Sequence, residues 1–502
     1  MTRHPRSRKN IRHIRENAFL IGLISILWFL LRTGRKPSRA VYPCQQAAAL
    51  NGQIWLSIYV FPVLSMISGK TAYFFSGKRL IAVFFALMAL VSIAYYGWQY
   101  FQPVPDSINN NAGIDLTGRT AEAWPSSDIF VVSGTSGDDG GITGLIDLMG
   151  RNSAYFYQSS QEGGIQDQSG LIASDDVVLI KVNCQWNERG GTNTDLVRAL
   201  IQAIIDHPDG FSGEIIVADN GQDQYGSSNR GGSLSWERNN AEDTSQSLQT
   251  VVDSFAGSAN VSAYLWDTIT TNRVGEYSDG DLEDGYVVNT TINSRTGVMV
   301  SYPKFKTEQG THVSFKLGVW DPNTGTYNSS RLKVINVPVL KTHSIFGVTA
   351  CVKHYMGVPS DKLTASMGSR THNTVGRGGM GTLMVETRFP VLNILDAIWV
   401  NANPPSGATG SVGPSTPYVR ATRANVILAS TDPVALDYWA AKHILLPLSP
   451  EGAPLSAIDP DYAGSGSFGA WLRLSMDEIS RAGYPSTIDE GKMNVFVALL
   501  ES

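Results

Sequence analysis

Short apolar runs alternate with amphipathic stretches along most of the chain after its first quarter. The runs at 129–134, 176–183 and 214–220 carry Val, Ile or Leu at most positions, which is typical of strands buried on both faces. Apolar residues at 140–152 and 194–207 instead recur with helical spacing. Strands that alternate with helices are joined by right-handed crossovers. The pattern therefore predicts an α/β fold in which helices flank a mostly parallel sheet.

The alternation returns in the second half of the chain, after an irregular interval. Apolar runs at 331–343 and 425–430 predict further strands, and the segments 346–357 and 433–445 have the pattern of helices. The interval at about 221–330 is rich in Gly, Ser, Asn and Asp and contains short alternating stretches, which are typical of hairpins. We therefore expect a β-rich insertion in this interval.

Three longer apolar segments lie near the amino terminus, at 17–31, 54–68 and 80–101. Only the third clearly reaches the roughly 20 residues that span the hydrocarbon core of a bilayer. The first two are shorter, so each either spans the bilayer or lies tilted at its surface. The sequence thus predicts a membrane arm of two to three apolar segments at 1–101, a linker at 102–127 and a soluble body at 128–502.

Charge is divided unevenly between the arm and the body. Residues 1–101 contain 13 Lys and Arg but a single acidic residue, Glu16, whereas the rest of the chain contains 26 basic and 43 acidic residues. A basic arm suits a lipid bilayer as its partner. An acidic body argues against a protein that binds nucleic acid over a broad surface.

Basic residues also predict the orientation of the third apolar segment. Lys70, Lys78 and Arg79 precede it, and such residues favour the cytoplasmic side of a membrane. Three spans then place the body outside the cytoplasm, which is the localisation we expect. Two spans would place the body inside, and the basic residues that follow the first segment favour that alternative.

The cysteines limit the possible cofactors. Cys44, Cys184 and Cys351 lie more than a hundred residues apart, so the chain has neither a CxxC zinc motif nor an iron–sulfur cluster motif. Its histidines also lack the HExxH arrangement of zinc peptidases. No metal site is predicted, and the sequence leaves any cofactor unknown.

Polar residues end four of the apolar runs, at the places where open parallel sheets bind ligands. These residues are Lys181 and Asn183, Asp219, Lys341 and His343, and Asp432. A lysine in a buried strand must reach a carboxylate, a ligand or solvent, because an unpaired buried ammonium is very costly. Ion pairs with Asp219, Asp396 or Asp437 are the structural alternative for the lysines, and a helix N-cap is the alternative for Asp432.

The segment 341–354 is the richest in candidate chemistry. We expect the N-terminus of its helix to bind a phosphate or carboxylate beside Lys341 and Lys353. His343 is the candidate acid–base group, and Lys341 is the candidate nucleophile or base. Asn183 and Thr349 are further candidate ligand-binding residues. The expected pocket gathers Lys181, Lys341, His343 and Lys353 at the carboxyl edge of the sheet, with Asp219, Asp396 and Asp432 around its rim.

Two stretches rich in glycine add weaker signals. The sequence GRGGMG at 376–381 fits the GxGxxG pattern, but it follows a polar loop rather than a strand. A loop that approaches phosphate, or a hinge, is therefore favoured over a dinucleotide site. The stretch at 401–417 cannot pack a core and is predicted to form a lid.

Four blocks of the chain occur in the same order as in a known family. The chain resembles the domain-of-unknown-function family 362 through VVLIKVN, VPVLKTHSIFGVTACVKHYMGV, LNILDAIWV and VILASTDPVALDYWAA, over most of 175–445. Many members of this family are exported or carry a ferredoxin-like iron–sulfur unit, for which this chain lacks the cysteines. The family pattern has Lys-Pro-Asn in place of Lys181-Val182-Asn183 and Lys-Asn in place of Lys353-His354. The resemblance implies no particular reaction.

These observations leave three classes of function open. The first is an enzyme or cofactor-using domain that acts on a small anionic molecule. The second is a membrane-anchored protein that binds such an anion without chemistry. The third is a structural protein without a ligand. Loss of turnover with intact binding in a His or Lys variant would favour the first class over the second.

Overall fold

The computed structural model describes residues 114, 116–137, 139–221, 232–404 and 415–500. The predicted membrane arm with Cys44, and half of the predicted linker, lie outside these residues. No helix within the described ranges is long and apolar enough to cross a membrane.

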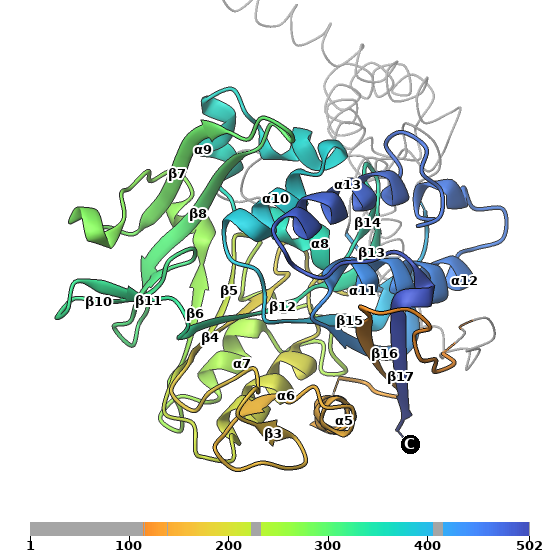
Figure 1. The fold of residues 1–502 in the computed structure, drawn as a ribbon, viewed down its shortest axis with the longest axis horizontal. Coiled ribbons are helices and arrows are strands. Elements are labelled where there is room, and N and C mark those ends of the chain that lie inside the picture. Colours follow the sequence, from red (N-terminus) through yellow and green to blue (C-terminus); the bar gives the residue numbers. More distant parts are fainter. Residues whose placement is uncertain (1–113, 115, 138, 222–231, 405–414, 501–502) are drawn as a thin grey trace, which may run out of the picture. The chain divides into compact units, whose positions relative to one another are not determined.

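A mixed sheet of ten strands forms the centre of the described body (Figure 1). Eight strands follow one another in the order β17 (Met493–Leu499), β1 (Ser127–Ser133), β16 (Thr422–Ser430), β15 (Leu392–Asn401), β12 (Leu332–Val337), β4 (Val177–Val182), β5 (Glu214–Asp219) and β6 (Val261–Leu265). The other two are β13 (Val339–His343), which pairs with β15, and β14 (Gly347–Thr349), which pairs with β13. The prediction of a large sheet in an α/β fold is confirmed.

Strand direction departs from the expected parallel arrangement at β16. This strand runs antiparallel to both of its neighbours, β1 and β15. The neighbouring strands from β15 to β6 are parallel to one another. The carboxyl end of β16 therefore lies at the opposite edge of the sheet from the carboxyl ends of β4 and β5.

Helices cover both faces of the sheet (Figure 1). One layer contains α5 (Asp139–Arg151), α6 (Thr194–Ile205) and α7 (Leu248–Asp253). The other contains α8 (Cys351–His354), α10 (Gly379–Glu386), α11 (Pro433–Ala440) and α13 (Phe468–Arg481). Alternate residues of β4 enter the two apolar clusters, with Leu179 on one side and Ile180 on the other. This two-sided burial explains why the strand is apolar at nearly every position.

A second, antiparallel sheet packs beside the main one (Figure 1). Its strands are β7 (Gly285–Ile292), β8 (Met299–Lys306), β9 (His312–Ser314), β10 (Gly318–Asp321) and β11 (Thr326–Asn328). The sequence placed the whole of 221–330 in one insertion. In the structure, α7 and β6 of that interval instead extend the main fold, because β6 pairs with β5.

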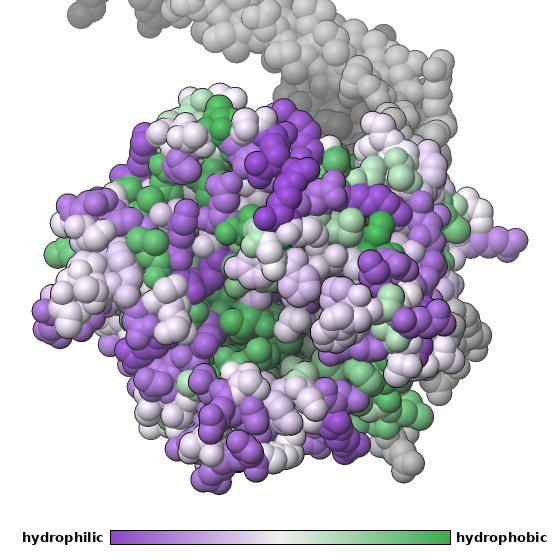
Figure 2. Space-filling view, viewed as in Figure 1, coloured by the Kyte–Doolittle hydropathy of each residue, from purple (hydrophilic) through white to green (hydrophobic). Residues whose placement is uncertain are grey.

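The remaining elements are short and lie in connections. They are β2 (Tyr157–Gln158), β3 (Gln166–Asp167), α9 (Asp361–Ser366) and α12 (Leu446–Leu448). On the face that Figure 2 shows, polar side chains cover most of the surface, and apolar side chains gather in a recess near β4 and β12.

Pro338 divides the predicted strand 331–343 into β12 and β13. β12 lies between β4 and β15 and pairs with both, whereas β13 pairs with β15 and β14 but not with β4. Proline has no amide hydrogen to donate to a neighbouring strand, and the carbonyl of Pro338 instead accepts the Asp396 amide at 2.9 Å. The chain thus leaves β4 but stays paired with β15 shortly before Lys341.

Candidate functional site

A pocket lies where β4, β5 and β13 end at one edge of the main sheet. It is lined by Asn183, Gln185, Asp219, Lys341, His343, Thr349, Lys353, His354 and Gly357. The pocket is small: its unfilled space of about 320 Å³ includes open solvent at the mouth, so the enclosed part is only a fraction of that volume. The cross-strand pairing of Lys341 with Thr349 brings the latter residue to the pocket.

Lys181 lies beneath the pocket rather than in its wall. Its Nζ is 3.0 Å from Asp219 Oδ1 and 3.2 Å from His354 Nε2, and its side chain is fully buried. The other carboxylate oxygen of Asp219 accepts the Cys184 amide at 2.9 Å. Burial lowers the pKa of Lys181, and Asp219 opposes that shift. The expected ion pair of Lys181 is therefore present, and it supports the floor of the site.

Lys341 and Lys353 have no carboxylate partner in the described residues. The ammonium of Lys341 donates to the Gly190 carbonyl, and Lys353 Nζ lies 5.1 Å from the centre of the Phe346 ring. Their exposed fractions are 1% and 4%. Burial lowers the pKa of both lysines to about 7, and Lys353 adds like-charge repulsion at Lys341. Both side chains can gain or lose a proton near neutral pH.

His343 is a hydrogen-bond donor rather than the acid–base group predicted from the sequence. Its Nδ1 accepts the Ile345 and Phe346 amides at 3.1 and 3.3 Å, which assigns the ring proton to Nε2. Burial and the nearby lysines hold the pKa of His343 well below its usual range, so the ring is neutral. A neutral ring whose Nδ1 is occupied offers an N–H to a ligand but no free lone pair.

Thr349 supplies a second unpaired group. Its hydroxyl is buried, and it has no hydrogen-bond partner in the described part of the chain. A buried hydroxyl without a partner costs free energy, which a bound ligand can recover. The pocket thus offers the Thr349 hydroxyl, the His343 Nε2–H and two lysine amines.

The expected helix over 346–357 is wrong. Gly347 has a left-handed φ of +77° and begins β14, so only the four residues of α8 remain helical before a 3₁₀ turn. The first amides of α8 are also occupied, because Asp437 accepts Cys351 N at 2.7 Å and Val352 N at 2.9 Å. The first amides of α8 are therefore not available to an anion. Lys353 lines the pocket without these amides beside it as further donors.

Two of the predicted rim residues do not line the pocket. Asp432 follows the antiparallel strand β16 and caps α11 by accepting Val434 N and Ala435 N at 2.9 and 3.0 Å, as in the structural alternative. Asp396 is also engaged elsewhere, since its carboxylate accepts the backbone amides of Asn193 and Ile398. Buried carboxylates that accept backbone amides serve to position the chain.

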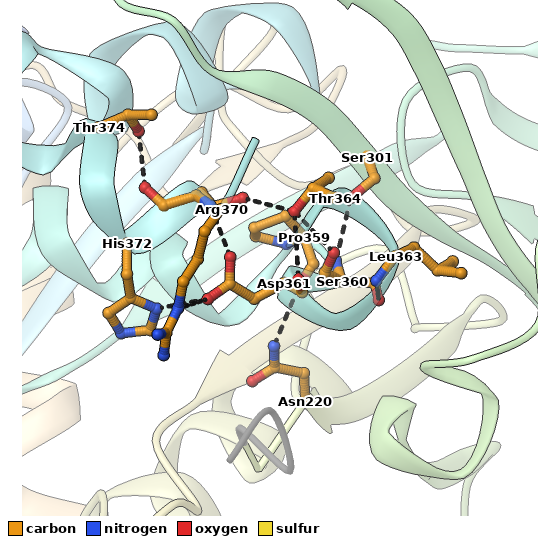
Figure 3. A network of polar contacts seen from close by, with 11 residues as sticks. Asn220, Ser301, Pro359, Ser360, Asp361, Leu363, Thr364, Arg370, His372 and Thr374 are labelled. Carbon is orange, nitrogen blue, oxygen red and sulfur yellow. Dashed lines mark hydrogen bonds and ion pairs between the residues drawn. The ribbon is translucent and has the colours of Figure 1, made fainter. Parts of the chain in front are cut away.

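A network of polar contacts surrounds Asp361, outside the residues that line the pocket (Figure 3). Its carboxylate lies between Arg370 Nε at 3.1 Å and His372 Nδ1 at 2.9 Å. Burial favours the neutral acid, but these hydrogen bonds hold the pKa of Asp361 below its usual range. His372 is thereby fixed 6.3 Å from Phe346, measured between ring centres, and Phe346 in turn contacts Lys353.

The glycines of GRGGMG have a packing role. Gly378 has a left-handed φ of +85° and precedes α10. A Cβ atom on Gly381 would lie 2.3 Å from the Ser475 carbonyl of α13, so these two helices can approach only because the residue is glycine. This arrangement disfavours a dinucleotide site. The predicted lid lies partly outside the described residues.

Sequence reasoning missed three residues of the pocket, Gln185, His354 and Gly357. His354 Nδ1 lies 2.7 Å from Asn336 Oδ1, and its Nε2 lies 2.9 Å from the Val182 carbonyl and 3.2 Å from Lys181 Nζ. A Cβ atom on Gly357 would lie 2.6 Å from both Lys181 Nζ and Asp219 Oδ1. The sequence carries no local signal for these roles, because the partners are far apart along the chain.

No cluster of three His, Cys, Asp or Glu residues that could hold a metal ion occurs among the described residues. Cys184 and Cys351 are both buried and free. Burial raises the pKa of each thiol, so neither is a reactive thiolate near neutral pH.

Comparison with protein families gives one match. Residues 332–442 match the family described as Domain of unknown function (DUF362), which confirms the resemblance for the last three of its four blocks, whereas VVLIKVN lies outside the matched residues. The match runs from the start of β12 to just beyond α11 and contains Lys341, His343 and Lys353. A comparison with curated proteins finds no match to the chain.

Proposed function

The chain carries a DUF362 segment at residues 332–442, and we propose that its α/β body binds a small carboxylate or phosphate in the pocket lined by Lys341 and Lys353. The proposal rests on one observation, the kind of side chains that line the pocket. Two lysines without carboxylate partners, a neutral histidine N–H and an unpaired hydroxyl all line one small space. Each of these groups can donate a hydrogen bond, and Asp219 is already paired with Lys181.

An anion would relieve the energetic cost of this arrangement. Buried ammonium groups are expensive without a negative partner, and here the nearest carboxylates are bound to Lys181 or to backbone amides. A bound oxyanion supplies that negative charge and accepts from the Thr349 hydroxyl. A positive pocket in an acidic body also selects for an anion against the overall field of the protein.

The proposal includes the setting of this body. The apolar segments at 17–31, 54–68 and 80–101, with the basic residues around them, favour a membrane anchor that keeps the body outside the cytoplasm. Such a protein is either an enzyme acting on the bound anion or a binding protein for it. The two amines that titrate near neutral pH favour the enzyme.

Isothermal titration calorimetry of the purified full chain tests the anion site. Inorganic phosphate, sulfate and acetate are the probes, and choline chloride is the cationic control. We expect saturable binding of at least one oxyanion and none of choline. A chain that remains folded and binds no oxyanion even at millimolar concentration contradicts the proposal.

A further inference from the structure

We infer that the Lys353 amine forms an imine with the carbonyl group of a small 2-oxo acid whose carboxylate is held by Lys341. This inference rests on the proposed anion pocket and adds a covalent step to it. It assigns different roles to two lysines that the sequence alone treats alike.

The surroundings of the three buried lysines select Lys353 as the nucleophile. Lys181 is held as an ammonium by Asp219 at 3.0 Å. Lys341 donates to the Gly190 carbonyl, and the charges of Asp219 and Asp396 favour its protonated form. Lys353 has no hydrogen-bond acceptor in the described residues, and its Nζ lies 5.1 Å from the centre of the Phe346 ring.

Burial keeps a useful fraction of Lys353 unprotonated at neutral pH, since its pKa is about 7. Only the neutral amine carries the lone pair that attacks a carbonyl carbon. An adjacent cationic group and a desolvated site are the two known means of activating a lysine for this reaction. Burial is the means present at Lys353, and Lys341 lines the same pocket.

A 2-oxo acid fits this division of roles. Its carboxylate pairs with the Lys341 ammonium, and its carbonyl carbon is attached directly to that carboxylate. The Thr349 hydroxyl and the His343 Nε2–H are the remaining donors that line the pocket. Both can donate a hydrogen bond to the carbonyl oxygen. The small volume excludes bulky substrates.

The reaction is balanced without any further reactant. A bond forms from Lys353 Nζ to the carbonyl carbon, and a proton of the amine moves to the carbonyl oxygen to give a carbinolamine. The bond from carbon to that oxygen then breaks, and the oxygen leaves as water with the second proton of the amine. The product is an imine, which no oxidation or reduction accompanies.

Reductive trapping tests this step on the purified full chain. The protein is incubated with pyruvate and sodium cyanoborohydride, digested and examined by mass spectrometry. We expect a carboxyethyl group at Lys353 well before exposed lysines such as Lys306 react, and suppression of this label by excess phosphate. Labelling of Lys353 no faster than Lys306 overturns the inference, and this result needs no variant that folds.

Lys353→Arg is the matched variant, because it keeps a positive charge but cannot form an imine. We expect this variant to lose the label at position 353 while labelling of exposed lysines such as Lys306 is unchanged. Retained phosphate binding by the wild-type chain without label at Lys353 refutes the imine alone. Failure of the wild-type chain to bind any oxyanion refutes the proposed function as well.

Discussion

Lys181, Lys341 and Lys353 are equally buried, but they differ in what surrounds them. Lys181 has a carboxylate at 3.0 Å, Lys341 has a carbonyl, and Lys353 has an aromatic ring. A close counter-ion holds a buried ionisable group in its charged form. A buried group without a counter-ion changes its protonation state with pH and with ligand binding. The first lysine therefore supports the site, and the other two respond to its occupant.

Lys341→Met should weaken phosphate binding while leaving the fold largely intact. The loss of one charge-assisted hydrogen bond corresponds to about tenfold to a hundredfold in affinity. Calorimetry measures this change, and thermal denaturation checks the fold. The control is Lys306→Met, which removes an exposed lysine of β8 outside the pocket. Equal affinity of both variants for phosphate would show that Lys341 does not bind the anion.

Anion affinity should decrease as pH rises through about 7. In the free pocket Lys341 and Lys353 lose their protons near that pH, and a bound anion favours the protonated forms. Binding then takes up protons, and affinity falls by up to about tenfold per pH unit for each lysine involved.

Sulfate is the appropriate probe for this pH series, because its own charge is constant. Among the groups facing the lysines, His343 and His372 have lowered pKa values and Asp219 is paired with Lys181, so none reverses the sign of the effect. Calorimetry in buffers of different ionisation enthalpy measures the proton uptake. Affinity that is constant from pH 6 to 9, a range set by the lysine pKa of about 7, would contradict the assignment.

At the scale of elements, two buried aspartates that lie close together in the chain bind the first amides of different helices. Asp432 caps α11, whereas Asp437 within α11 reaches the first amides of α8, the helix that carries Lys353. Asp437 thus connects a helix of the core to the pocket. Burial raises its pKa to about 7, so its hydrogen bonds to these amides matter for keeping it ionised.

Asp437→Ala and Asp432→Ala should separate stability from binding. Each variant leaves backbone amides without an acceptor and should lower the free energy of unfolding by about 1–3 kcal/mol. Only Asp437→Ala should also weaken oxyanion binding, because α8 loses the acceptor of its first two amides. Chemical denaturation and calorimetry measure the two effects. Comparable loss of affinity in Asp432→Ala would contradict its placement away from the pocket.

The sequence was sufficient to locate the lysines but not to arrange the elements around them. A lysine in a strand such as VVLIKVN is conspicuous because the rest of that strand is apolar. Hydrophobic periodicity carries no information about strand direction, so the reversal of β16 was missed and Asp432 was misplaced. Periodicity also predicted a helix through Gly347, whose left-handed φ ends that pattern.

At the scale of the whole molecule, the basic first 101 residues and the acidic remainder give the protein two regions of opposite charge. An acidic surface around a positive pocket repels anions at long range and attracts them only close to the site. Ionic strength screens the first effect more than the second, because buried charges are screened less. The body is therefore suited to a small ligand present at substantial concentration rather than to a scarce polyanion.

The proposed orientation predicts the behaviour of a reporter fusion. A reporter that is active only in the cytoplasm, joined after residue 127, should give no signal, because the basic residues before the third apolar segment favour its cytoplasmic end. The same reporter joined after Lys78 is the positive control, since that position is then cytoplasmic. Strong activity of the fusion after residue 127 would contradict the external body and favour two spans.

The division of the strand at Pro338 affects how the ligand preference of such a pocket can change between related proteins. Lys341, His343, Thr349 and Lys353 all lie within one short peptide, from β13 to α8, whereas the floor comes from β4 and β5. In the proposed anion site, most of the donor groups therefore come from one contiguous segment, whose strands β13 and β14 lie outside the central strand order of the sheet. Exchanging that segment between related chains would transfer specificity as a unit, without redesign of the scaffold that bears it.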